Sequence, residues 1–162
     1  MNKNNHKSPR SPAAQDFLEK VEFQDAALIS FVTSAIIVPA YDAVKRDFAI
    51  IRAEYMLLLC LAHFPALTAQ DVSRLTGRPR NSISRAVHRM LSEGYITRVP
   101  DPEDGRQAKL AITEGGREMH NKIAAMMVES QSAILSVLTN REQTTLRDIL
   151  KKLAVHAEMA KN

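Results

Sequence analysis

The feature that most constrains the fold is a series of capping and turn-forming residues that divides the middle of the chain into short elements. Thr68 is suited to cap a helix over 69–76, and Gly77 ends that helix. A second helix is predicted over 79–93, because a proline is tolerated in a first turn and Gly94 provides the stop. Two short helices joined by a glycine turn predict a helix-turn-helix.

A β-hairpin is predicted directly after this helix pair. Tyr95–Val99 and Gln107–Ile112 are short strand candidates with apolar residues for an inward face. Asp104-Gly105 between them is a strong turn signal, because glycine accepts the positive φ that a tight hairpin needs. The hairpin is expected to project as a wing, and Arg106 just beyond its tip is placed to enter a DNA minor groove.

Basic charge around these elements is carried almost entirely by arginine. From Arg74 to Arg98 there are six arginines and one carboxylate, Glu93, and no lysine occurs between Lys45 and Lys109. An arginine fork can grip a phosphate or the edge of a guanine with two hydrogen bonds, whereas a solvated helix surface normally pairs glutamate with lysine. This concentration of arginine indicates contact with duplex DNA.

Helical spacing gives the second short helix two faces. Its core-facing residues are Ile83, Val87, Met90 and Leu91. The opposite face is polar and is suited to bind phosphates and base edges, with Arg85 as the expected recognition-helix residue. The residues predicted to contact DNA are Arg78, Arg80, Asn81, Ser82, Ser84, Arg85, Arg89, Arg98 and Arg106. Asp104 is expected to brace the wing by pairing with Arg98 or Arg106.

Composition narrows the class of protein. The formal net charge of +4 and the pI near 9.4 favour polyanionic partners. Cys60 is the only cysteine, which excludes an intrachain disulfide and a thiolate-rich metal site and fits a reducing compartment. No phosphate-binding glycine loop, Gly-x-Ser-x-Gly turn or clustered metal-ligand spacing is present. We therefore expect no enzyme activity, no cofactor, no metal and no membrane association, and a cytoplasmic protein.

The expected fold class is mostly α with a small β-hairpin, that is, a winged helix-turn-helix with long terminal helices. The first long helix is expected from Asp16, with a bend or break at Pro39, and 52–63 is predicted to be a buried central helix. A long helix over 114–138 and a last helix follow. These helices carry more apolar surface than one winged domain can bury, which favours a dimer.

The predicted organisation follows from these elements. It consists of a disordered arm over 1–14 and a single domain over 15–162, with dimerisation helices over 15–50 and 114–162 and a DNA-binding lobe over 52–113.

Two motifs carry a family resemblance. Asp104-Gly105-Arg106 is followed by a leucine strand and then by Thr113-Glu114-Gly115-Gly116-Arg117, and the helix pair ends with the segment Met90–Ile96. In these motifs the sequence resembles the MarR family of winged helix-turn-helix transcription regulators, over about Phe23 to Leu153. Gly105 stands where the family commonly carries a second basic residue, and Pro39 is a further departure.

The resemblance implies a bacterial or archaeal, nucleoid-associated homodimer whose terminal helices pair and which binds a pseudo-palindromic double-stranded DNA operator. It also implies a small aromatic or phenolic effector, for which the candidate binding residues are Tyr41, Arg52, Tyr55 and Met56. The expected function is a repressor that such a ligand releases from DNA. Ordinary core packing is the alternative role for these four residues.

Two alternative functions stay open. The first is a winged-helix protein-interaction module without DNA binding. A protein-binding face should show an exposed apolar anchor, and the arginine-rich face has none, which argues against this alternative. The second is a cysteine-based redox sensor. Cys60 lies in the apolar run 57–61, and burial there would raise its pKa and block access to the thiol, which favours a structural role.

Overall fold

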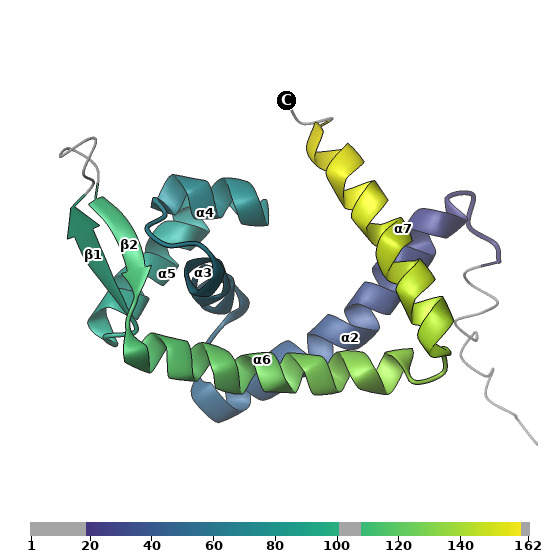
Figure 1. The fold of residues 1–162 in the computed structure, drawn as a ribbon, viewed down its shortest axis with the longest axis horizontal. Coiled ribbons are helices and arrows are strands. Elements are labelled where there is room, and N and C mark those ends of the chain that lie inside the picture. The colour runs from purple at the N-terminus through teal and green to yellow at the C-terminus, as the bar shows by residue number, and fades with distance from the viewer. Residues whose placement is uncertain (1–18, 101–107, 160–162) are drawn as a thin grey trace, which may run out of the picture. The chain divides into compact units, whose positions relative to one another are not determined.

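The computed structural model describes residues 19–100 and 108–159, and this part of the chain is mostly helical with one two-stranded sheet (Figure 1). The elements are α2 (Gln24–Phe48), α3 (Arg52–His63), α4 (Ala69–Thr76), α5 (Arg80–Ser92), β1 (Ile96–Pro100), β2 (Ala108–Ile112), α6 (Glu114–Leu135) and α7 (Asn140–Met159). The chain divides into two compact units, one up to Ala35 and one from Ile36 onward. The predicted arm over 1–14 lies outside the described residues.

Helix α3 is the centre of the second unit. It packs against α4, α5, α6 and β2 (Figure 1). The buried residues of α3 are Ala53, Glu54, Tyr55, Leu57, Leu58, Cys60 and Leu61. The prediction of a central helix buried on most sides is therefore confirmed. Burying each large apolar side chain contributes about 1.5–3 kcal/mol, so α3 anchors the helices around it.

The helix-turn-helix forms as its turn residues predict. The Asp71 backbone N–H donates to Thr68 Oγ1 over 3.1 Å, and the Thr68 N–H donates to the Asp71 carboxylate over 3.0 Å, which completes a capping box at the start of α4. Gly77 ends α4 with φ of 64°, and Gly94 follows α5 with φ of 71°. Both glycines occupy the left-handed region that other residues rarely adopt.

The hairpin forms with β1 antiparallel to β2, each strand within one residue of its predicted start and end. Ile96 pairs with Ile112 and Arg98 with Leu110. Leu110 also donates its N–H to the carbonyl of Leu67 over 2.8 Å, which ties the sheet to the segment before α4. Ile96 and Leu110 are buried and supply the expected inward face. The wing is thus fixed to the helix-turn-helix by its base.

Helix α2 differs from its prediction. It begins at Gln24 rather than near Asp16, and it continues through Pro39 to Phe48, so of the expected bend or break the break does not occur. Ala40 and Val44 are buried in the core of the second unit, which holds the residues after the proline in a helical path. Helix α2 is also long enough to cross a membrane, and an 18-residue window within it is apolar enough, with a mean hydropathy of 1.7.

The last two helices leave apolar side chains exposed. Helix α6 ends at Leu135, three residues before its predicted end, and Thr139 caps the following helix by accepting from the Glu142 N–H. The exposed large apolar side chains of α6 and α7 are Val128, Ile134, Ile149, Leu150, Leu153 and Val155. These helices therefore have apolar surface available for a partner.

Gly116 in the first turn of α6 supports a stability prediction. A Cβ added there would lie 2.0 Å from the Tyr95 carbonyl oxygen and 2.9 Å from Ile112 Cγ1. Gly116→Ala should therefore lower the free energy of unfolding by about 1–3 kcal/mol, measured by urea denaturation. Gly115→Ala is the matched control, because a Cβ added there would come no nearer than 4.0 Å to Thr113 Oγ1 and alanine favours a helix. Equal midpoints for the two variants would contradict this packing.

Candidate DNA-binding interface

Helix α5 separates its residues as the helical spacing predicts. Ile83, Val87 and Met90 are buried in the core, and Leu91 is half-buried against it. The exposed residues of α5 are Arg80, Asn81, Ser84, Arg85, His88 and Ser92, and Ser82 is half-buried. Packing of the inner face fixes the rotation of α5 about its axis, so the polar residues form one outward surface.

A shallow hollow runs along this outward surface. Its lining consists of Ser84, Arg85, His88, Arg89 and Ser92. This set holds two guanidinium groups, an imidazole and two hydroxyls, and it includes no carboxylate. Such groups donate hydrogen bonds to phosphate oxygens and to the acceptors on guanine, and a negatively charged backbone meets no repulsion here.

Arg89 has a partner that sequence spacing did not reveal. One nitrogen of its guanidinium, Nη1, donates to both carboxylate oxygens of Glu54 over 3.1 and 3.0 Å. Glu54 belongs to α3 and is only 3% exposed, so this pair crosses from the recognition helix to the buried central helix. Arg89 was predicted to contact DNA; it also carries this ion pair, and its contact with DNA stays a prediction.

Arg78 is also held more firmly than the sequence suggests. It lies between α4 and α5, where the Ser73 hydroxyl donates to its carbonyl over 2.7 Å. The side chain is half-buried, and Nε is buried without a hydrogen-bond partner among the described residues. Its charge is also close enough to lower the pKa of Tyr41 against the larger effect of burial. Arg78 therefore acts electrostatically on Tyr41 from the turn between α4 and α5.

The wing contributes one described candidate. Arg98 is exposed on β1 opposite Leu110. Arg106 and Asp104 lie outside the described residues, and so does the predicted brace between Asp104 and an arginine. The described interface therefore consists of the outward face of α5, the turn before it and Arg98.

The four residues predicted to bind a ligand do come together. The guanidinium carbon of Arg52 lies 5.3 Å from the centre of the Tyr41 ring, and the Tyr41 hydroxyl donates to Met56 Sδ over 3.4 Å. The rings of Tyr41 and Tyr55 meet edge to face with centroids 6.2 Å apart. Burial raises the pKa of Tyr55 to about 12 and also raises that of Tyr41. Both phenols are neutral donors at ordinary pH.

Two histidines extend this aromatic cluster, and the sequence reasoning missed them. His120 of α6 stacks on Tyr55 with centroids 5.9 Å apart, and His63 meets His120 edge to face at 5.6 Å. Burial lowers the pKa of His120, and the electrostatic effects of His63 and Arg117 lower it further, which favours the neutral imidazole. Its Nδ1 is buried without a partner among the described residues. Only the packing of α6 on α3 brings these rings together.

Cys60 is buried in α3, as expected for a structural cysteine. Burial raises the pKa of its thiol, which disfavours the reactive thiolate. Within residues 19–100 and 108–159, no group of three or more histidine, cysteine, aspartate or glutamate side chains is placed to hold a metal ion.

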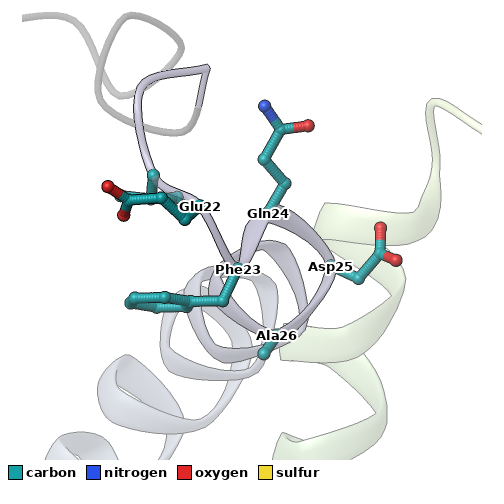
Figure 2. A pocket seen from close by; sticks show the side chains of 6 residues that line it. Glu22, Phe23, Gln24, Asp25 and Ala26 are labelled. Atoms are coloured by element: carbon teal, nitrogen blue, oxygen red, sulfur yellow. The ribbon is translucent and has the colours of Figure 1, made fainter.

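A second hollow lies at the start of α2, in the first unit. Figure 2 shows the side chains of Glu22, Gln24 and Asp25 spread around the first turn, with the Phe23 ring to one side. One continuous segment, 21–26, lines this hollow, and it includes none of the predicted site residues. Two of the side chains are acidic, which is unfavourable for DNA. This hollow is not part of the candidate interface.

Comparisons with known proteins match the segment that forms the helix-turn-helix. Residues 50–107, which include α3, the helix-turn-helix and β1, match the sequence model of the MarR family. An HTH-type transcriptional regulator of Bacillus subtilis, YybA, is 22% identical over 113 residues, or 70% of this chain and 75% of that protein.

Two solved structures share the fold. MarR of E. coli without ligand has a TM-score of 0.68 at 20% identity, over 79% of this chain and 95% of that one. CouR of Rhodococcus jostii, bound to p-coumaroyl-CoA, has a TM-score of 0.72 at 20% identity, over 89% and 96%. The sequence model of the MarR family thus matches the segment that holds the helix-turn-helix and its arginine-rich α5, and the chain shares its fold with these solved structures.

Proposed function

We propose that the protein is a homodimeric repressor that binds a pseudo-palindromic operator and leaves it when a small aromatic acid binds. The observation that carries this proposal is the outward face of α5, where exposed Arg85 lies in a hollow whose lining includes no carboxylate. The buried inner face of α5 prevents this surface from turning inward. Repression needs only occupancy of the DNA, whereas activation would require a further contact with the transcription machinery.

The candidate residues divide by the part of DNA that each suits. Arg85 and Asn81 are exposed on α5 and carry the groups that pair with guanine and adenine edges in the major groove. Five further described candidates are suited to phosphate contact, and they are Arg78, Arg80, Ser82, Ser84 and Arg98. Arg106 is proposed to enter the minor groove beside the wing.

The proposed dimer uses the apolar side chains that α7 leaves exposed. Ile149, Leu150, Leu153 and Val155 of this helix are each at least 43% exposed. A twofold axis through this surface would pair α7 with its copy and place the two α5 helices in successive major grooves, about 34 Å apart.

The proposed effector site is the cluster around Tyr41. Arg52 is exposed at its edge and supplies a positive charge, while the phenols of Tyr41 and Tyr55 supply neutral hydrogen-bond donors. An aromatic carboxylate matches both features. Arg78 lies two residues before α5 and its charge acts on Tyr41, so we infer that occupancy of this cluster shifts the recognition helix.

The DNA assignment is tested with an operator selected from genomic fragments. Arg85→Ala should weaken operator binding by about 1–3 kcal/mol and relax discrimination at one base pair. Arg106→Ala should weaken binding of all sequences and reduce the slope of log K against log salt by about one. Fluorescence anisotropy measures both effects. Arg141→Ala on α7 is the control: it removes the same charge away from the interface and should change neither the operator affinity nor the salt slope. Wild-type affinity in the Arg85→Ala, Arg106→Ala double variant would contradict the mechanism.

The dimer is tested by placing charge on α7. The double substitution Leu150→Glu, Leu153→Glu should raise the dimer dissociation constant by at least about a hundredfold, since each buried leucine contributes about 1.5–3 kcal/mol. Light scattering during size-exclusion chromatography measures the mass. Thr144→Glu, Thr145→Glu adds the same charge at exposed polar positions of α7 and should remain dimeric. A wild-type protein that is monomeric at micromolar concentration would refute the dimer.

The effector site is tested with benzoate as the probe. Benzoate should release the operator from the wild-type protein. Arg52→Ala should raise the benzoate concentration required for release by roughly tenfold, because the Arg52 guanidinium is the only charge proposed to hold the benzoate carboxylate. Arg46→Ala removes an exposed arginine that pairs with Asp47 instead and should respond as the wild type does. Equal benzoate responses of the Arg52 variant and the wild type would place the effector elsewhere.

A further inference from the structure

The ion pair between Glu54 and Arg89 joins the buried central helix α3 to α5, which carries the proposed DNA face. The Glu54 side chain is 4% exposed and that of Arg89 is 37% exposed, so the carboxylate is inside the protein while the guanidinium reaches the surface. The guanidinium lines the hollow on α5 together with Arg85 and His88. One residue of the proposed DNA face is thus bound to a charge in the core.

Glu54 is fixed in place by a second hydrogen bond. Its carboxylate accepts the backbone N–H of Ile51 over 2.8 Å, in the capping interaction that begins α3. A carboxylate buried to this extent requires a positive partner, and Arg89 is the ion-pair partner that the described residues provide. Glu54 therefore cannot follow Arg89 outward, and moving the guanidinium away from α3 toward the phosphates would leave a buried charge unpaired.

This arrangement affects the balance between specific and non-specific binding. A free arginine beside Arg85 would add one positive charge to the face and would bind phosphates of any sequence. Paired with Glu54, Arg89 adds no net charge there. The base-reading groups of Arg85 and Asn81 then contribute a larger share of the binding free energy.

We propose that Glu54 is a specificity-determining residue, which holds Arg89 against α3 and thereby withholds its charge from the phosphate backbone. The inference rests on the proposed function, because it concerns the same DNA-binding face. It assigns Arg89 the role of a positioning residue for α5 and removes it from the set of DNA contacts.

The test measures binding to random-sequence and operator duplexes over a range of salt concentrations. Glu54→Gln keeps an oxygen that accepts the Ile51 N–H but removes the charge that holds Arg89. The freed guanidinium should strengthen binding to the random duplex about tenfold, steepen the slope of log K against log salt by about one, and lower the ratio of specific to non-specific affinity. A purely structural role would weaken both kinds of binding and would leave the slope unchanged.

The matched variant is Glu54→Gln, Arg89→Gln, which removes both charges and leaves no buried carboxylate unpaired. It should restore the wild-type salt slope, since Arg89 makes no phosphate contact in the wild-type protein. Circular dichroism and thermal melting establish that each variant is folded. If Glu54→Gln does not fold, the double variant decides alone: a wild-type slope supports the proposal, and a slope shallower by about one overturns it.

The remaining outcomes separate this inference from the proposed function. A folded Glu54→Gln protein with an unchanged or shallower slope overturns the inference while leaving DNA binding intact. Failure of the wild-type protein to bind either duplex contradicts the proposed function itself and removes the basis of the inference with it.

Discussion

Burial of the inner face of α5 against α3 is the constraint on which the rest of the structure depends. Ile83, Val87 and Met90 lose nearly all contact with water in this packing. At about 1.5–3 kcal/mol for each side chain, their burial outweighs any single surface ion pair on the same helix. The rotation of α5 is therefore set by apolar contacts, and the arginines on its other side are presented outward as a consequence.

The same central helix connects the two proposed activities. Helix α3 carries Glu54, which holds Arg89 of α5, and it carries Tyr55 in the aromatic cluster around Tyr41. Arg78 lies directly before α5 and its charge reaches Tyr41. A ligand in that cluster would alter the electrostatic surroundings of Arg78, which lies next to the DNA-binding helix in sequence.

Local signals were sufficient to predict most elements of the fold. Thr68, Gly77 and Gly94 act through their own backbone and nearest neighbours, and each has the predicted role in the structure. At Pro39 the helix does not break, because packing of Ala40 and Val44 in the core outweighs the local tendency of proline to break a helix. Local propensity fails where tertiary contacts compete with it.

Predicting the site was harder than predicting the fold, because its decisive contacts join distant segments. Spacing on α5 identified the outward face, yet Glu54 and Arg89 are 35 residues apart, and no periodicity relates them. The stacking of His120 on Tyr55 depends likewise on how α6 lies across α3. Tyr41, Arg52, Tyr55 and Met56 were chosen for their chemistry, and the fold does assemble them.

Methylation interference on the bound operator tests the central claim most directly, since it reports which guanine N7 atoms in the major groove must stay free for binding. Two α5 helices related by a twofold axis predict interference in two patches whose centres lie about one helical turn apart, with none in the major groove between them. Binding that tolerates methylation at every guanine N7 would contradict the claim that α5 reads the major groove.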